Sequence, residues 1–130
     1  MTINRRILIV VVCLALIICM SCPVFASASK TFFTKTAAGF SCTGSGTVSD
    51  WSATAVLNAV SLSKAVPPEY ATCETWVMAY DSEGNYIGAS TTSGNLRASA
   101  TYISETEIDF TYCSFEFTNI DLGGYTLNNS

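Results

Sequence analysis

Short runs of residues in which apolar and polar side chains alternate constrain the fold of this chain most. The longest run is EIDFTYCSFEFT, at Glu107–Thr118, and shorter runs are separated by Gly, Pro, Asn and Asp. No long stretch has the 3.6-residue periodicity of an amphipathic helix. Alternation between turn signals is typical of half-buried strands. The pattern therefore predicts an all-β fold, either a sandwich or a barrel.

About seven strands are expected in roughly 100 residues, which is typical of an immunoglobulin-like antiparallel β-sandwich. They are Ala38–Thr43, Ala53–Ser61, Thr72–Tyr80, Tyr86–Ser90, Leu96–Ser104, Glu107–Thr118 and Tyr125–Asn128. Gly44-Ser45-Gly46 is expected to end the first strand. In the longest strand the apolar residues change face near Cys113-Ser114. Because one extra residue moves later side chains to the other face, this change predicts a β-bulge.

The N-terminus has the features of a secretory signal peptide. Two arginines precede an apolar run of 14 residues, Ile7–Met20, and the small residues of Ala26-Ser27-Ala28 follow Pro23. A basic start, a short apolar segment and a small-x-small site together indicate cleavage after Ala28. We expect a signal helix over 1–28, a secreted β-sandwich over 29–130, and an outward-facing membrane anchor as the alternative if cleavage fails.

Charge excludes one class of partner. After residue 28 the chain has ten acidic residues and only four basic ones, Lys30, Lys35, Lys64 and Arg97, which gives a net charge of −6. Nucleic acids and anionic membrane surfaces would repel such a protein, because binding phosphates requires clustered basic residues. The expected partner is a cell-envelope component or another protein, with membrane contact only through an uncleaved N-terminal segment.

Catalytic and metal-binding arrangements are largely absent from the sequence. The chain contains no histidine, which excludes Ser-His-Asp and Cys-His nucleophile pairs and makes a zinc site improbable. Glu105, Glu107 and Asp109 alternate, so on a strand their carboxylates would lie about 7 Å apart on one face. We interpret them as a solvated face, with a minimal carboxylate enzyme as the alternative. No catalytic residue and no cofactor is predicted.

The stretch YDSEGNYIGAS, Tyr80–Ser90, has oxygen-bearing side chains at alternate positions, as a calcium loop does. Counting from Asp81, however, Tyr86 stands where a helix-loop-helix calcium site needs glycine, and Thr92 where it needs a bidentate acid. Glu83-Gly84-Asn85 contains residues that tolerate positive φ. The stretch is therefore predicted to be a β-hairpin rather than a metal site.

An aromatic strand, a D-x-x-G-N turn and a strand of I-G-x-S type over Thr72–Ser104 resemble small exported immunoglobulin-like proteins of Gram-positive bacteria. The resemblance implies the fold and brings no catalytic motif. Of the three cysteines beyond the signal, Cys73 and Cys113 would lie on neighbouring strands of an immunoglobulin-like order. Sequence allows three single pairings, and this order favours a Cys73–Cys113 disulfide. Cys42 would then be free or available for dimerisation.

Aromatic residues in polar or loop segments are the remaining indication of function. Trp51 lies in Ser49-Asp50-Trp51-Ser52, and Tyr70 follows Pro67-Pro68, so both are candidate binding residues. Trp76, Phe110 and Phe115 are expected in the core. The leading hypothesis is a secreted, non-enzymatic binding or interaction module. The alternative is a small secreted antimicrobial or toxin-like protein, although its negative charge does not favour attack on anionic membranes.

Overall fold

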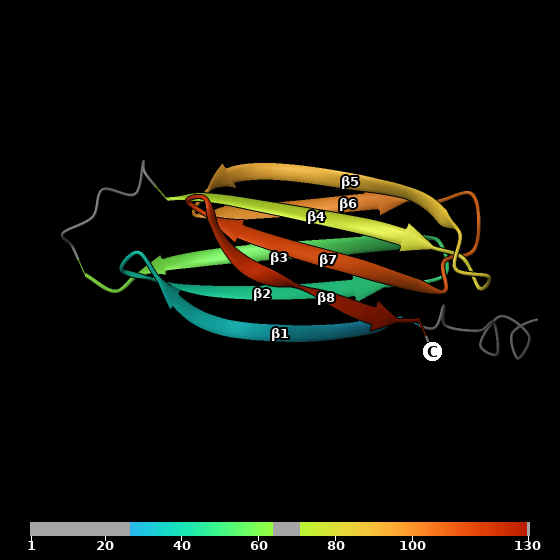
Figure 1. The fold of residues 1–130 in the computed structure, drawn as a ribbon, viewed down its shortest axis with the longest axis horizontal. Helices are drawn as coiled ribbons and strands as arrows, with labels where there is room; N and C mark the ends of the chain where they lie inside the picture. The colour runs from blue at the N-terminus through green and yellow to red at the C-terminus, as the bar shows by residue number, and fades with distance from the viewer. Residues whose placement is uncertain (1–26, 64–70, 130) are drawn as a thin grey trace, which may run out of the picture.

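The computed structural model describes residues 27–63 and 71–129, and within them every regular element is a strand (Figure 1). The strands are β1 (Ala28–Ala37), β2 (Phe40–Val48), β3 (Ser52–Ser61), β4 (Thr72–Tyr80), β5 (Tyr86–Asn95), β6 (Arg97–Ile103), β7 (Phe110–Phe117) and β8 (Ile120–Asn128). They form two four-stranded antiparallel sheets, β1-β2-β3-β6 and β5-β4-β7-β8. The all-β prediction is confirmed. Residues 1–26 of the predicted signal segment lie outside the described residues.

The predicted strand Thr72–Tyr80 is confirmed without change, and β3 and β6 lie close to their predicted bounds. The extent of strand was underestimated in three places. Strand β1 was not predicted, β2 continues through Gly44 and Gly46, and β5 continues to Asn95. Gly44 is required inside β2 because the ring of Phe33 on β1 occupies the space beside it. A β-carbon at position 44 would lie 2.4 Å from that ring.

The prediction of a β-bulge near Cys113-Ser114 is wrong. Strand β7 alternates regularly: Thr111, Cys113, Phe115 and Phe117 are buried, and the residues between them are more exposed. Its pairing with β4 has no register shift, whereas its pairing with β8 shifts between Phe115 and Glu116. The apparent change of face arose because both faces of β7 carry aromatic residues.

A thin core separates the sheets. The buried residues of β3 are Ala53, Ala55, Leu57 and Ala59, and alanines also fill much of β6. With such small side chains the sheets lie close enough for a hydrogen bond across the core, because Thr75 Oγ1 on β4 donates to the carbonyl of Ala55 at 3.4 Å. Sheets usually pack about 10 Å apart. Short side chains therefore bring some backbone groups of one sheet within reach of the other.

Both sides of the sandwich are closed by contacts between the sheets (Figure 1). On one side β1 lies beside β8, and Lys35 Nζ donates to the carbonyl of Leu122 at 3.0 Å. On the other side Leu96 joins β5 directly to β6 at a φ of 63°. Its N–H donates to the Ala71 carbonyl and its carbonyl accepts from Ala59 N–H. These contacts leave the two outer faces as the broad exposed surfaces.

Candidate functional site

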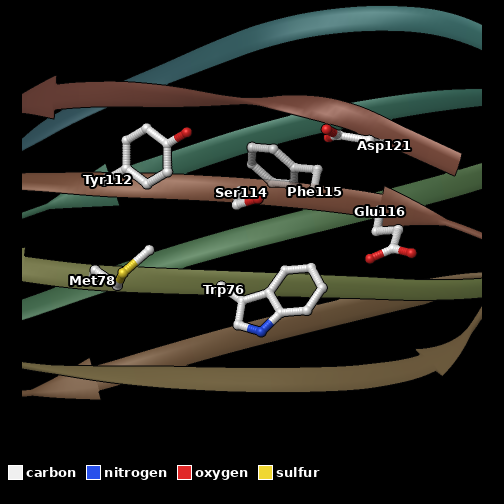
Figure 2. A pocket seen from close by; sticks show the side chains of 7 residues that line it. All are labelled: Trp76, Met78, Tyr112, Ser114, Phe115, Glu116 and Asp121. Atoms are coloured by element: carbon white, nitrogen blue, oxygen red, sulfur yellow. The ribbon is translucent and has the colours of Figure 1, made fainter. Parts of the chain in front are cut away.

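A groove of about 410 Å³ lies on the outer face of the β5-β4-β7-β8 sheet (Figure 2). Side chains from three strands surround it. The lining residues are Trp76, Met78, Tyr112, Ser114, Phe115, Glu116 and Asp121. Trp76 and Met78 come from β4, Asp121 comes from β8, and the other four come from β7. The groove therefore combines three aromatic residues and a thioether with two carboxylates.

Strand register explains why the surface is hollow at this point. Trp76 lies opposite Ser114, which in turn lies opposite Gly124, so a large side chain is followed by two small ones across the sheet. Tyr112 covers the glycine, since a β-carbon at position 124 would lie 1.7 Å from the Tyr112 hydroxyl oxygen. The depression therefore lies at the small side chain of Ser114, and Trp76 and Tyr112 form its aromatic border.

One end of the groove is acidic. Glu116 is the register partner of Glu74 on β4 and of Asp121 on β8, which places three acidic residues in one row across three strands. Asp121 Oδ1 accepts the N–H of Gly123 at 2.8 Å, which orients this carboxylate. Like charges directly opposite each other on adjacent strands are destabilising. The row therefore lowers the stability of the folded protein, and functional sites often have such a cost in stability.

Charge is segregated between the two sheets. The four strands of the β5-β4-β7-β8 sheet contain Glu74, Glu116 and Asp121 but no lysine or arginine. The four strands of the other sheet contain Lys30, Lys35 and Arg97 but no acid. No basic side chain within the strands of its own sheet therefore neutralises the acidic row.

The predicted binding residue Trp51 lies outside the groove. Trp51 is 43% exposed in the turn between β2 and β3, and its carbonyl accepts the N–H of Ser104 at 2.9 Å. This turn belongs to the other sheet, so Trp51 does not line the groove. Tyr70 lies outside the described residues. The prediction for Tyr70 therefore stays a prediction.

Trp76 was predicted to lie in the core, and this is wrong. It is partly exposed on the outer face, whereas its neighbours Thr75 and Val77 are fully buried. Phe110 is also only partly buried and stacks on Tyr80, with 4.8 Å between the ring centroids. Phe115 is buried as expected. The alternation of Trp76 and Met78 with buried residues was visible in the sequence, but it did not reveal which face was inside.

The cysteine prediction is also wrong. Cys42, Cys73 and Cys113 are free thiols and all three are buried. Cys73 lies opposite Phe117 and Cys113 opposite Val77, so the two are four register positions apart on adjacent strands. That offset is about 13 Å, beyond the roughly 7 Å that a disulfide can span between α-carbons. Because Cys42 is fully buried, it is not available at the surface for dimerisation.

The acidic residues Glu105, Glu107 and Asp109 precede β7 and do not lie along a strand face. Glu107 and Asp109 border a small depression of about 120 Å³ with Ser82. Within residues 27–63 and 71–129, no cluster of three or more acidic or cysteine side chains could hold a metal ion. The loop therefore does not have the strand geometry on which the carboxylate alternative depended.

The turn Asp81–Asn85 connects β4 to β5, so the predicted hairpin is confirmed. Asp81 Oδ1 accepts the N–H groups of Glu83 and Asn85, both at 2.9 Å, and Gly84 has a φ of 80°. These hydrogen bonds, the one from Asn85 N–H first, lower the pKa of the Asp81 carboxyl. The carboxylate thus stabilises its own turn.

Comparison with known proteins gives no assignment: the chain matches no family model, no curated protein and no solved structure. In the part of the chain that the structure describes, no helix is long and apolar enough to cross a membrane. The groove itself is therefore the basis for a functional proposal.

Proposed function

We propose that this protein is an exported, non-enzymatic binding module of immunoglobulin-like architecture. Its binding site is the groove bordered by Trp76 and Tyr112, and its partner is a cell-envelope component or protein that presents a lysine or arginine side chain. Export is supported by the N-terminal sequence, and a binding role by the groove and the lack of histidine. The acidic row at the groove is the observation that carries the proposal.

The order of the strands supports the immunoglobulin-like part of the proposal. When β2–β8 are taken as the seven strands of such a sandwich, β3 pairs with β6 and β4 with β7, although neither pair is consecutive in sequence. Pairing of the second strand with the fifth and the third with the sixth is characteristic of immunoglobulin-like sandwiches. Strand β5 pairs with β4, and β1 is an additional strand beside β2.

Charge complementarity supports a partner with a basic side chain. Glu74, Glu116 and Asp121 attract a cation, and their own sheet supplies none. An ammonium or guanidinium group is also attracted to the faces of Trp and Tyr rings. A basic side chain can therefore contact a carboxylate with its charged end and an aromatic ring with its stem or head group. A neutral sugar would use the rings but would leave the row of like charges unneutralised.

Tryptophan fluorescence can test this proposal because the chain has only two tryptophans. In a Trp51→Phe background, emission reports on Trp76 alone. We expect an oligolysine peptide to change this emission, with weaker binding at high salt because exposed charges are screened. Glu116→Gln should weaken binding about two- to fivefold, as expected for loss of one exposed ion pair. Trp76 itself can be removed in a second variant and binding measured by calorimetry.

Glu105→Gln is the matched control, because it removes one exposed acid outside the groove. It should leave oligolysine binding unchanged. An equal loss in Glu105→Gln and Glu116→Gln would show general charge attraction and contradict the proposed site. Binding of a neutral oligosaccharide without oligolysine binding would also contradict it, in favour of a glycan site. Salt-sensitive self-association in sedimentation would instead identify a second copy as the partner.

A further inference from the structure

Cys42 and Cys73 lie in different sheets at the same end of the sandwich. Cys42 is on β2 and Cys73 on β4, and both side chains are fully buried between the sheets. Phe40, two residues before Cys42, packs on Phe117 with 5.3 Å between ring centroids. Phe117 is the register partner of Cys73. One ring contact across the core thus joins the immediate surroundings of the two cysteines.

Backbone hydrogen bonds hold the sheets together at this end. Cys42 is the register partner of Ala59, whose N–H donates to the Leu96 carbonyl at 2.8 Å. The N–H of Leu96 donates to the carbonyl of Ala71 at 2.9 Å, and Ala71 is two residues before Cys73. Both alanines are buried, so no large side chain of theirs separates the strands here.

The Cys42 thiol also affects the ionisation of the Cys73 thiol. Burial first, and the neighbouring Cys42 thiol second, raise the pKa of the Cys73 thiol to about 11. Thiols with such a high pKa react slowly at neutral pH, because the thiolate is the reactive species. Any oxidation of this pair therefore takes place during folding, before both groups are fully buried.

The other two pairings are excluded by position. Cys113 lies about 13 Å from Cys73 along the β4–β7 ladder. On the opposite sheet it packs against Gly46, where an added β-carbon would be 3.0 Å from Cys113 Sγ. Gly46 is four residues beyond Cys42 on the same strand, again about 13 Å away. Cys113 is thus distant from both other cysteines.

We propose that Cys42 and Cys73 form an inter-sheet disulfide when the chain folds in an oxidising compartment, while Cys113 remains a thiol. The two thiols lose two protons and two electrons as the S–S bond forms, and a disulfide oxidant, such as oxidised glutathione or the active-site disulfide of a thiol oxidase, is reduced to two thiols. The bond would tie β2 to β4 across the thin core. The proposal does not depend on the binding groove.

Peptide mapping tests the pairing directly. The full chain is reduced, unfolded, refolded with oxidised and reduced glutathione, and then alkylated in denaturant before digestion. We expect a linked pair of peptides containing Cys42 and Cys73, a mass about 2 Da lower than that of the two reduced peptides, and an alkylated Cys113. Because the oxidant is supplied in vitro, failure to pair is distinguished from failure of export.

Single substitutions make the test specific. Cys113→Ser should keep the linked peptides, whereas Cys42→Ser and Cys73→Ser should abolish them. Circular dichroism of each variant establishes that it has folded, and reduction of the intact wild-type disulfide should lower the melting temperature. Alkylation of all three thiols in folded, glutathione-treated protein would overturn the proposal. A linkage through Cys113, or through a cysteine before residue 28 in place of Cys42 or Cys73, would overturn it as well.

Discussion

Glu74 and Glu116 lie directly opposite each other on β4 and β7. Asp121 lies on the other side of Glu116, so the central glutamate has an acidic register partner on both sides. Two facing carboxylates repel each other unless a cation lies between them. A stable strand pair would more readily be built with a neutral residue at one of these positions. The arrangement is therefore the observation on which the proposed binding of a cationic partner rests.

Glu116→Gln should stabilise the unbound protein while weakening its binding of oligolysine. Removing the central charge relieves repulsion on both sides, and we expect a gain of about 0.5 kcal/mol in the free energy of unfolding at low salt. The gain should shrink at high salt because of screening. Urea denaturation at two salt concentrations measures it. Glu105→Gln, a change of equal charge outside the row, should give a smaller gain, and equal gains would contradict this interpretation.

Lys35 should stabilise the side of the sandwich where β1 meets β8. Its ammonium donates to the Leu122 carbonyl at 3.0 Å and to the Tyr125 hydroxyl at 3.2 Å, and lies 5.1 Å from the Phe33 ring centroid. Lys35→Met keeps an apolar stem of similar length but removes these interactions. We expect a loss of about 1 kcal/mol and faster hydrogen exchange in β1.

Lys30→Met is the comparison for this change, because Lys30 is on the same strand with its ammonium 5.9 Å from the Phe32 ring centroid. We expect it to have a smaller effect on unfolding. If both substitutions accelerate exchange in β1 equally, the contacts of Lys35 with β8 do not hold the two edge strands together.

Gly44→Ala should destabilise the protein because Phe33 occupies the space beside the glycine. The new β-carbon would lie 2.4 Å from the ring, and overpacking of this kind costs about 1–3 kcal/mol. Chemical denaturation measures the loss. Ser45→Ala, at the adjacent and more exposed position, should be nearly neutral. A second substitution, Phe33→Leu, should recover part of the loss in Gly44→Ala if the clash is its cause.

Gly44 also shows why β1 and the second half of β2 were not predictable. Gly-Ser-Gly is usually a turn signal, and only the position of the Phe33 ring reveals that glycine is needed within a strand. The connection from β1 to β2 is a two-residue turn at Ala38 and Gly39, both with positive φ. Alanine is not a usual residue for such a turn, so this hairpin has no recognisable turn signal.

Thr72–Tyr80 and the Asp81–Asn85 turn were predictable because local chemistry decides them. Alternation defines the strand, and Asp81 and Gly84 supply the hydrogen bonds and φ of the turn. The groove was not predictable, since both faces of β7 carry aromatic residues. Only the pairing of strands distant in sequence determines that Trp76 and Tyr112 face outward, and that Glu74 meets Glu116.

The Asp81 carboxylate should give the β4–β5 hairpin a pH-dependent stability. Its hydrogen bonds, first from Asn85 N–H, lower its pKa below the ordinary value of 3.8. The folded state therefore binds this proton more weakly than the unfolded state. The stabilisation is complete above pH 3.8 and is lost as the pH falls through the lower pKa of the folded state.

Titration of the side-chain carboxyl by NMR should locate the Asp81 midpoint below the value in an unfolded peptide of the same sequence. Protection of the Glu83 and Asn85 amides, measured as their exchange rate relative to that of the unfolded peptide at the same pH, should decrease over the same pH range, because protonation weakens their acceptor. Asp81→Ala should show little protection at both amides at every pH. A midpoint at or above the peptide value would mean that the carboxylate does not accept these hydrogen bonds in solution.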